Sequence, residues 1–267
     1  MYQVLEVSLA DLTRLYQYKQ QDLFMADFSL KGFDYPWLIS SRPWKSGEKV
    51  LDVGAAYSPL PIHIQQCYGC EMWVADDFGL KSSDLFWTRN SSPHEHIAKH
   101  PEVKYVLERL GIPKESSLPP DYFDVVYSVS ALEHVPFALM PSVWQHMDSL
   151  LKPGGEMLHA IDIAFPSNAG LHKVLAAIVF DALYILTPQG MRQRHCLATP
   201  KAYARLILQT LGVHYQLGKH LSALNMVLDP DVLTEDYRYG LHRINKDQMT
   251  DYHYQRVASL LLRMKKA

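Results

Sequence analysis

Residues Val50 to Pro61 read VLDVGAAYSPLP. This stretch predicts a short buried strand, a tight turn at Gly54 and a helix that begins near Ser58 and Pro59, since serine suits an N-cap and proline the first helical turn. A strand, turn and helix in this order are typical of nucleotide-binding α/β folds, in which the turn holds the cofactor. Such turns usually carry two or three glycines, and this one has a single glycine.

Strands and helices continue to alternate on the carboxyl side of this stretch. Strands are predicted for EMWVADD (71–77), YFDVVYSVS (122–130) and EMLHAIDIAF (156–165), and helices for parts of 91–103 and 138–151. This alternation predicts a doubly wound parallel sheet with right-handed crossovers. Two late strands, VHYQLG (213–218) and YHYQRVASLLLRM (252–264), are expected to add an antiparallel edge.

The flanking segments have other patterns. Residues 8 to 30 carry a helical stripe of apolar side chains, and FDYPWLISSRPW (33–44), with two prolines, is expected to be a connecting loop. A largely apolar helix or helix pair is predicted for 168–186. TPKAYARLILQTLG (199–212) predicts an amphipathic helix that ends at Gly212.

Composition indicates a globular protein that can bury a sizeable core. The chain has 267 residues, 48% of them hydrophobic, and a formal net charge of −2. No global field therefore favours nucleic acid or an anionic membrane, and we expect no nucleic-acid partner. The N-terminal residues lack a signal-peptide pattern and no apolar run could span a bilayer, so a cytoplasmic protein without a transmembrane segment is predicted.

Histidine, cysteine and acidic residues do not predict a metal site. Cys67 and Cys70 form a C-x-x-C pair without a second pair to complete a zinc site, and a structural role is expected for both. Glu133, His134 and His146 could suggest ligands, but the position one turn before Glu133 is Ser130 rather than a carboxylate.

Three predicted strand ends carry the candidate chemistry, because ligands of open α/β sheets bind at the carboxyl ends of the strands. The first end carries Asp52 and Gly54, followed by a helix whose free N–H groups attract anions. The second carries Asp76 and Asp77, and an acid there can accept both hydroxyls of a ribose. The third is SVSALEHV, 128–135. A helix cap is the alternative role for the paired acids.

Together, VLDVGAAYSP, WVADD, DYFDVVYSVSALEHVP and LLKPGGEMLHAIDI resemble the class I S-adenosylmethionine-dependent methyltransferases, in particular the small-molecule group with an L-E-H-V signature (methyltransferase type 11-like). The resemblance covers roughly residues 47 to 165. It implies a Rossmann-like seven-stranded sheet of order 3-2-1-4-5-7-6 with the last strand antiparallel. We expect a helical arm over residues 1–46, a methyltransferase domain over 47–267 and a lid-like helical insertion over 166–200.

The resemblance also assigns cofactor contacts. The first motif would face the methionine portion of S-adenosylmethionine, which leaves as S-adenosylhomocysteine. Asp76 best matches the ribose-binding acid, with Asp77 as the alternative one residue on, and Phe78 would lie near the adenine. Residues 128–130 would pass under the sulfonium, largely through backbone groups. The cofactor-binding residues expected in the first and third motifs are Asp52, Gly54, Ala55 and Ala56, and Ser128, Val129 and Ser130.

The turn departs from the family pattern D-x-G-x-G-x-G, since Ala56 and Ser58 replace its later glycines. A dinucleotide needs those glycines for close packing against its pyrophosphate, and S-adenosylmethionine has no pyrophosphate. The substitutions therefore favour methyl transfer over a nicotinamide-dependent oxidoreductase. A non-catalytic binding or scaffold protein of the same fold is the other alternative, although the strand-end acids are retained.

The acceptor is expected to be a small molecule, methylated on oxygen, such as a sugar or secondary metabolite. His134 is the candidate general base, because its motif lies beside the cofactor crevice. The alternative is that the Glu133-His134 pair caps a helix or orients the loop. The apolar 171–186 segment could be a lid, a dimer contact, a peripheral membrane helix or core, and either a monomer or a homodimer is compatible with the sequence.

Overall fold

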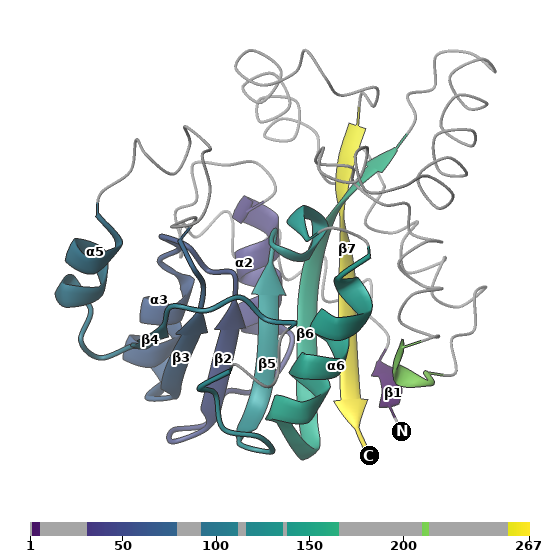
Figure 1. The fold of residues 1–267 in the computed structure, drawn as a ribbon, viewed down its shortest axis with the longest axis horizontal. Coiled ribbons are helices and arrows are strands. Elements are labelled where there is room, and N and C mark those ends of the chain that lie inside the picture. Colours follow the sequence, from purple (N-terminus) through teal and green to yellow (C-terminus); the bar gives the residue numbers. More distant parts are fainter. Residues whose placement is uncertain are drawn as a thin grey trace.

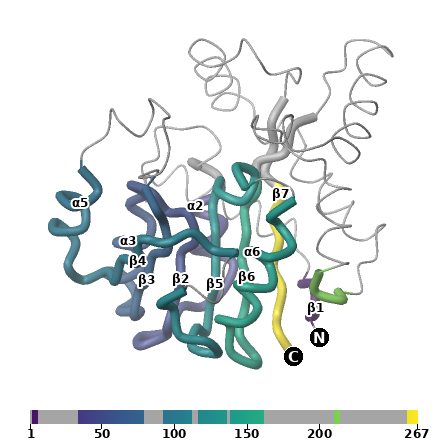
Figure 2. The backbone as a smooth tube through the Cα atoms, in the orientation of Figure 1, coloured from purple at the N-terminus to yellow at the C-terminus, as the bar shows by residue number. Residues whose placement is uncertain are grey.

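A mixed seven-stranded sheet forms the centre of the computed structural model (Figure 1 and Figure 2). Along the sheet the strands follow the order β1-β7-β6-β5-β2-β3-β4. β7 runs antiparallel to both neighbours, and the other pairings are parallel. The structure describes residues 2–5, 31–78, 92–111, 116–135, 138–165, 210–213 and 256–267.

The sheet lies between helices on its two faces (Figure 1). One core layer packs residues of α6 against the sheet, and the other packs residues of α2 and α3 against the opposite face. The strands are β1 (Tyr2–Leu5), β2 (Lys49–Val53), β3 (Glu71–Ala75), β4 (Lys104–Val106), β5 (Phe123–Val129), β6 (Leu151–Phe165) and β7 (Arg256–Lys266). The helices are α2 (Lys31–Ser40), α3 (Leu60–Tyr68), α5 (Pro93–Lys99), the 3-10 turn η2 (Leu132–His134) and α6 (Met140–Leu150).

The central strands are buried on both faces, as a doubly wound sheet requires. Val50 of β2 belongs to the α2/α3 layer and Leu51 to the α6 layer, and both side chains are fully buried. In β5, Val125 and Val126 alternate between the same two layers. The continuous apolar runs of these strands therefore supply both cores, and the predicted Rossmann-like sheet with one antiparallel strand is confirmed.

The outermost strand comes from an unexpected part of the chain. The late strand pair was expected to build this edge, and β7 confirms one member of that pair. The place beyond β7 is taken by β1, with Tyr2 opposite Lys266 and Leu5 opposite Arg263. Val213 is not part of a strand, and residues 214–218 lie outside the described residues.

Side-chain contacts hold β1 at this edge. The Tyr2 hydroxyl donates to Asp148 Oδ1 of α6 at 2.6 Å. Lys266 of β7 donates to the carbonyl oxygens of Asp148 and Leu151 at 2.6 and 2.9 Å. Carbonyl groups at the end of a helix favour such a cation, so both outer strands are joined to the end of α6. Within the expected helical arm, residues 2–5 thus form a strand, and residues 6–30 lie outside the described part.

The loop predicted for residues 33–44 is wrong over its first eight residues, which belong to helix α2. Pro36 lies inside this helix, where proline is normally unfavourable. The neighbouring Tyr35, Trp37 and Leu38 are 3%, 1% and 0% exposed and pack into the α2/α3 layer. Burial of three large side chains outweighs the local preference that the prolines suggested.

Candidate active site

The turn after β2 is held close to the loop after β5. Gly54 has a φ of +78°, and a Cβ atom placed on it would lie 2.6 Å from the Cβ of Ala131. Its N–H donates to the carbonyl oxygen of Ala75 at the end of β3, at 2.9 Å. Only glycine fits this position, because both the positive φ and the close neighbour exclude a side chain. The turn therefore brings the carboxyl ends of β2, β3 and β5 together.

Ser58 organises the start of α3. Its Oγ accepts the N–H of Leu60 at 3.2 Å and lies 2.9 Å from the Tyr35 hydroxyl of α2. The helix is assigned from Leu60, one residue later than expected, with Pro59 immediately before it. Ser58 thus satisfies an N–H group at the helix start, as the sequence suggested, and also joins the turn to α2.

The Asp76 carboxylate lies directly against this turn. Its Oδ2 accepts the N–H of Ala56 at 2.7 Å, and its Oδ1 accepts the N–H of Phe78 at 2.5 Å. The side chain is buried, and Asp76 is 9% exposed. Burial raises the pKa of Asp76, and the N–H groups of Phe78 and Ala56 oppose that rise because they favour the charged form.

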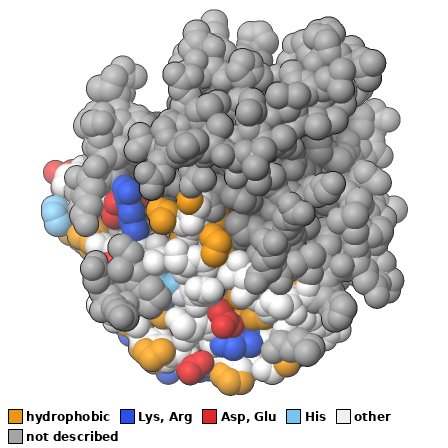
Figure 3. Space-filling model, turned by 45° about the vertical axis from the view of Figure 1, so that its right-hand side comes forward, with side chains coloured by type: hydrophobic (Ala, Val, Ile, Leu, Met, Phe, Trp, Pro, Cys, Tyr) orange, Lys and Arg blue, Asp and Glu red, His pale blue; other side chains and the backbone are white. Residues whose placement is uncertain are grey.

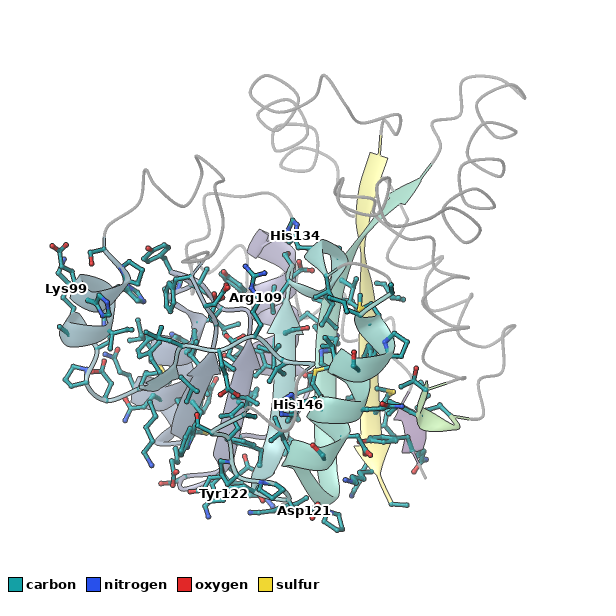
Figure 4. All side chains as sticks on the ribbon, in the orientation of Figure 1. Lys99, Arg109, Asp121, Tyr122, His134 and His146 are labelled. Carbon is teal, nitrogen blue, oxygen red and sulfur yellow. The ribbon has the colours of Figure 1, made fainter. Side chains whose placement is uncertain are left out.

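Asp77, the alternative ribose acid, faces a different partner. Its carboxylate forms an ion pair with the Nε of Arg109, from the loop after β4. The Arg109 side chain is 60% exposed, whereas that of Asp77 is 14% exposed. In Figure 4, Arg109 and His134 lie toward the same end of the sheet, and Tyr122 and Asp121 lie at the opposite end. The two consecutive acids therefore have separate surroundings, one inside the turn and one beside an exposed arginine.

Phe78 is part of an aromatic cluster over β3, β4 and α5. Its ring lies 5.2 Å from Tyr57 and 6.1 Å from both His96 and Tyr105, centroid to centroid. The Tyr105 hydroxyl lies 3.3 Å from His96 Nε2. Phe78 is only 2% exposed, so its ring forms the base of this cluster, and Tyr57, from the turn after β2, is partly exposed.

Asp52 is 2% exposed at the end of β2, opposite Tyr127 of β5 in the sheet. Burial, followed by the charge of Asp52, raises the pKa of Tyr127 well above the ordinary tyrosine value. The charge of Asp52 also adds to the effect of burial on Tyr105, whose pKa is raised to about 12. Both phenol groups therefore remain neutral beside the Asp52 carboxylate.

A contact between two buried polar side chains holds the segment 128–130 in place. The Ser128 Oγ lies 2.8 Å from His159 Nδ1 of β6, and both residues are fully buried. Burial lowers the pKa of His159 to about 3, so the ring is neutral at neutral pH. Ser130 has a φ of +48°, and its N–H donates to the carbonyl oxygen of Ala160. The Ser128 side chain thus lies on the α6 side of the sheet, since the His159 ring that it contacts lies 4.8 Å from the Trp144 ring, centroid to centroid.

Glu133 and His134 lie on η2, directly after this segment. The Glu133 side chain is 1% exposed and that of His134 is 56% exposed, and His134 Nε2 lies 3.7 Å from Glu133 Oε1. A buried carboxylate thus lies beside a histidine ring that is open to solvent. Such an arrangement can orient an imidazole that accepts a proton from a bound molecule.

The structure brings most of the expected site residues to one edge of the sheet. Asp52, Gly54, Ala55 and Ala56 lie beside Asp76, and Ala131 connects their turn to the 128–134 segment. No sequence pattern pointed to Tyr127, Arg109 or His159, because each acts through a partner distant in the chain. The expected insertion, 166–200, and the apolar segment 171–186 lie outside the described residues.

Charged side chains of both signs occur on the face of the molecule drawn in Figure 3. On the face in Figure 3, blue and red side chains of the described residues lie side by side, without a large patch of one charge. Among the helices that the structure describes, none has the length and apolar character needed to cross a bilayer. The described part of the chain likewise contains no group of three or more histidine, cysteine or acidic residues arranged to hold a metal ion.

Known proteins share this fold. Residues 36–210, more than half of the chain, match the family described as methyltransferase domain. Phosphoethanolamine N-methyltransferase 2 of Haemonchus contortus, solved with S-adenosyl-L-methionine, has a TM-score of 0.53 at 15% identity over 94% of this chain and 56% of that chain. The same enzyme with phosphomonomethylethanolamine and S-adenosylhomocysteine gives 0.51 at 14% identity, over 96% and 57%.

A geranyl diphosphate C-methyltransferase of Streptomyces coelicolor A3(2), in complex with Mg²⁺, geranyl diphosphate and S-adenosyl-L-homocysteine, has a TM-score of 0.50 at 10% identity, over 100% of this chain and 91% of that chain. This chain spans little more than half the length of the Haemonchus enzyme, and at these identities the likeness concerns the fold. None of the curated proteins compared with the chain matches it in sequence. Because the family match covers more than half of its residues, the chain belongs to the methyltransferase-domain family.

Proposed function

We propose that this chain binds S-adenosylmethionine and transfers its methyl group to an oxygen atom of a small-molecule acceptor, such as a sugar or secondary metabolite. The observation that carries the proposal is the position of the Asp76 carboxylate, 2.7 Å from the N–H of Ala56, at the joined carboxyl ends of β2, β3 and β5. Sites for nucleoside cofactors in open α/β sheets lie at this edge.

The residues at this edge fit the cofactor. An acid for the ribose lies against a turn of small side chains, and one of its carboxylate oxygens can accept more than one hydrogen bond. The aromatic ring of Tyr57 lies 5.2 Å from that of Phe78, two residues after this acid, and could stack with a nucleobase. Methyltransferases with a similar fold have been solved with S-adenosylmethionine or S-adenosylhomocysteine, which supports the choice of cofactor.

When bound, S-adenosylmethionine supplies a methyl group that its sulfonium already activates, so the protein mainly aligns the acceptor and excludes water. Within this proposal, Asp76 holds the ribose, with Asp77 as the alternative. Backbone groups of 54–56 and 128–130 hold the methionine portion. His134 accepts the proton of the acceptor hydroxyl, because its ring is exposed and the buried Glu133 carboxylate lies 3.7 Å away.

Calorimetry tests the cofactor, with S-adenosylmethionine, S-adenosylhomocysteine and NAD titrated separately into the protein. We expect both sulfur compounds to bind and NAD to give no heat of binding. Absence of binding by both sulfur compounds would reject the proposal. The acceptor class is tested next, by incubation with panels of hydroxyl, amine and carbon acceptors and mass spectrometry of products. Methylation confined to amines or carbon would reject the oxygen acceptor while leaving the cofactor assignment intact.

A further inference from the structure

Asp76 makes two hydrogen bonds that join two different loops. One oxygen accepts the N–H of Ala56, in the turn after β2, and the other accepts the N–H of Phe78, in the loop after β3. The two contacts are 2.7 and 2.5 Å long, and Asp76 is 9% exposed. We call this pair of hydrogen bonds the Asp76 clamp. Carboxylate bonds to backbone N–H groups are among the stronger hydrogen bonds of proteins, and burial strengthens them.

The two residues that the clamp holds have unusual backbone conformations. Ala56 has a φ of +48° and Phe78 a φ of +49°. Residues with a Cβ atom rarely adopt this left-handed region, because the side chain crowds the following carbonyl group. Both strained residues therefore present their N–H groups to the same carboxylate, and the hydrogen bonds offset the cost of the strain.

A comparison within the turn shows what the clamp replaces. At position 54, a Cβ atom would lie 2.6 Å from Ala131, and the residue is glycine. At position 56, φ is also positive, but the residue is alanine and its N–H is held by Asp76. Glycine adopts this conformation without strain, whereas alanine requires an additional stabilising contact. The turn thus keeps the backbone path of a second glycine although the sequence lacks one.

We propose that Asp76 is a positioning residue that sets the left-handed conformation of Ala56, and so takes the place of the glycine absent from this turn. This role is additional to contact with the ribose, and its effect on cofactor binding rests on the proposed function. It acts through the backbone of Ala56, which faces the site for the cofactor. Loss of the carboxylate would release the turn as well as remove a ligand contact.

A double-mutant cycle tests the proposal with the parent protein, Ala56→Gly, Asp76→Ala and the double variant. Asp76→Ala should lower the affinity for S-adenosylmethionine roughly 10- to 100-fold, through both roles together. Ala56→Gly in the parent measures the effect of the substitution itself while the clamp is intact, because glycine adopts this conformation without the clamp. In the double variant, Ala56→Gly should restore affinity about three- to tenfold relative to Asp76→Ala. Equal affinities of the double variant and Asp76→Ala would overturn the positioning role.

Thermal unfolding without ligand gives a second reading of the same cycle. Ala56→Gly should raise the melting temperature of the Asp76→Ala protein more than that of the parent. Equal shifts in both backgrounds would overturn the clamp. These unfolding measurements do not depend on the cofactor. If the parent protein fails to bind S-adenosylmethionine, the proposed function is rejected, and the clamp is still tested by the melting temperatures. If Asp76→Ala does not fold, Asp76→Asn replaces it, since its amide keeps one acceptor oxygen.

Asp121 provides a matched control for the glycine substitution. It also has a positive φ, +46°, and its N–H donates to the carbonyl oxygen of Ser149 rather than to a carboxylate. Asp121 lies at the opposite end of the sheet from the candidate site (Figure 4). Asp121→Gly should shift the melting temperature equally with and without the Asp76 substitution. A rescue of Asp76→Ala by Asp121→Gly of the same size as that by Ala56→Gly would refute a specific link to Ala56.

Discussion

The hydroxyl groups of Tyr35 and Ser58 lie 2.9 Å apart and join helix α2 to the turn that follows β2. Ser58 also accepts the N–H of Leu60, so one side chain connects α2, the turn and the start of α3. Tyr35 is 3% exposed. The N-terminal side of the fold therefore takes part in shaping the candidate cofactor site.

Tyr35→Phe removes this hydroxyl and keeps the ring. We expect a loss of about 1 kcal/mol in the free energy of unfolding, together with a several-fold weaker affinity for S-adenosylmethionine, because the turn loses one of its supports. Urea denaturation and calorimetry measure the two effects. Tyr122→Phe is the matched control, since its hydroxyl donates to Glu71 at 2.8 Å at the far end of the sheet. It should lose similar stability with unchanged affinity, and equal affinity losses in both variants would contradict the role of Tyr35.

Gly54→Ala combines two unfavourable effects, a positive φ of +78° and a Cβ atom 2.6 Å from that of Ala131. We expect destabilisation by more than about 2 kcal/mol and loss of cofactor binding. Gly154 has the same φ of +78°, and nothing lies within 4 Å of its added Cβ. Gly154→Ala should therefore cost only the conformational part, about 1 kcal/mol. Urea denaturation of both variants separates the two contributions, and equal losses would show that Ala131 relaxes away.

His134→Ala tests the proposed base. Turnover should fall about 100-fold or more, while calorimetry should show unchanged affinity for S-adenosylmethionine. His146→Gln offers a comparison in α6, because His146 is 1% exposed and its Nδ1 accepts the N–H of Gly111. Full turnover of His134→Ala would show that the His134 ring only orients the loop or lies at the surface.

Acidification should destabilise the protein through His159. In the unfolded chain, this histidine gains a proton below its ordinary pKa of 6.5, whereas in the fold its pKa is lowered to about 3 by burial. The unfolded state binds more protons between these values, so stability is present above pH 6.5 and is lost as the pH falls. The expected loss is about 2 kcal/mol between pH 7 and pH 5.

Urea denaturation at the two pH values measures this loss. His63, His96 and His146 also have lowered pKa values, so the test is a difference between proteins. His159→Gln cannot gain a proton, and its amide can still bond to Ser128. It should be less stable at pH 7 but show a smaller change between the two conditions. The same pH dependence in both proteins would exclude His159 as the source.

Sequence patterns predicted the elements that depend on local order. The alternating strands, the tight turn at Gly54 and the carboxyl-edge position of Asp52 and Asp76 all follow from neighbouring residues. The contacts that shape the site did not follow, because Tyr35 and Ser58, or Ser128 and His159, meet only after the chain has folded. No spacing rule connects such pairs.

Two other differences arise from competition between local and tertiary preferences. Pro36 predicted a loop, yet its large neighbours form a helix because the sheet buries them. Residues 2–5 carried no signal for the sheet edge, since a short strand is specified by its partner and by the Tyr2 contact with Asp148. The carboxylate that holds Ala56 is visible only in three dimensions, because Asp76 and Ala56 lie on different loops.

The position of β7 between β6 and β1 has a consequence for the order of folding. Tyr2 pairs with Lys266, residues that lie almost the whole chain apart, so this contact closes a very long loop. During synthesis, β1 emerges first and has no partner until residues 256–266 leave the ribosome and enter the sheet beside β6. Completion of the sheet is therefore a late step, and the rate at which β7 inserts sets how long the edge of β6 stays open to wrong partners.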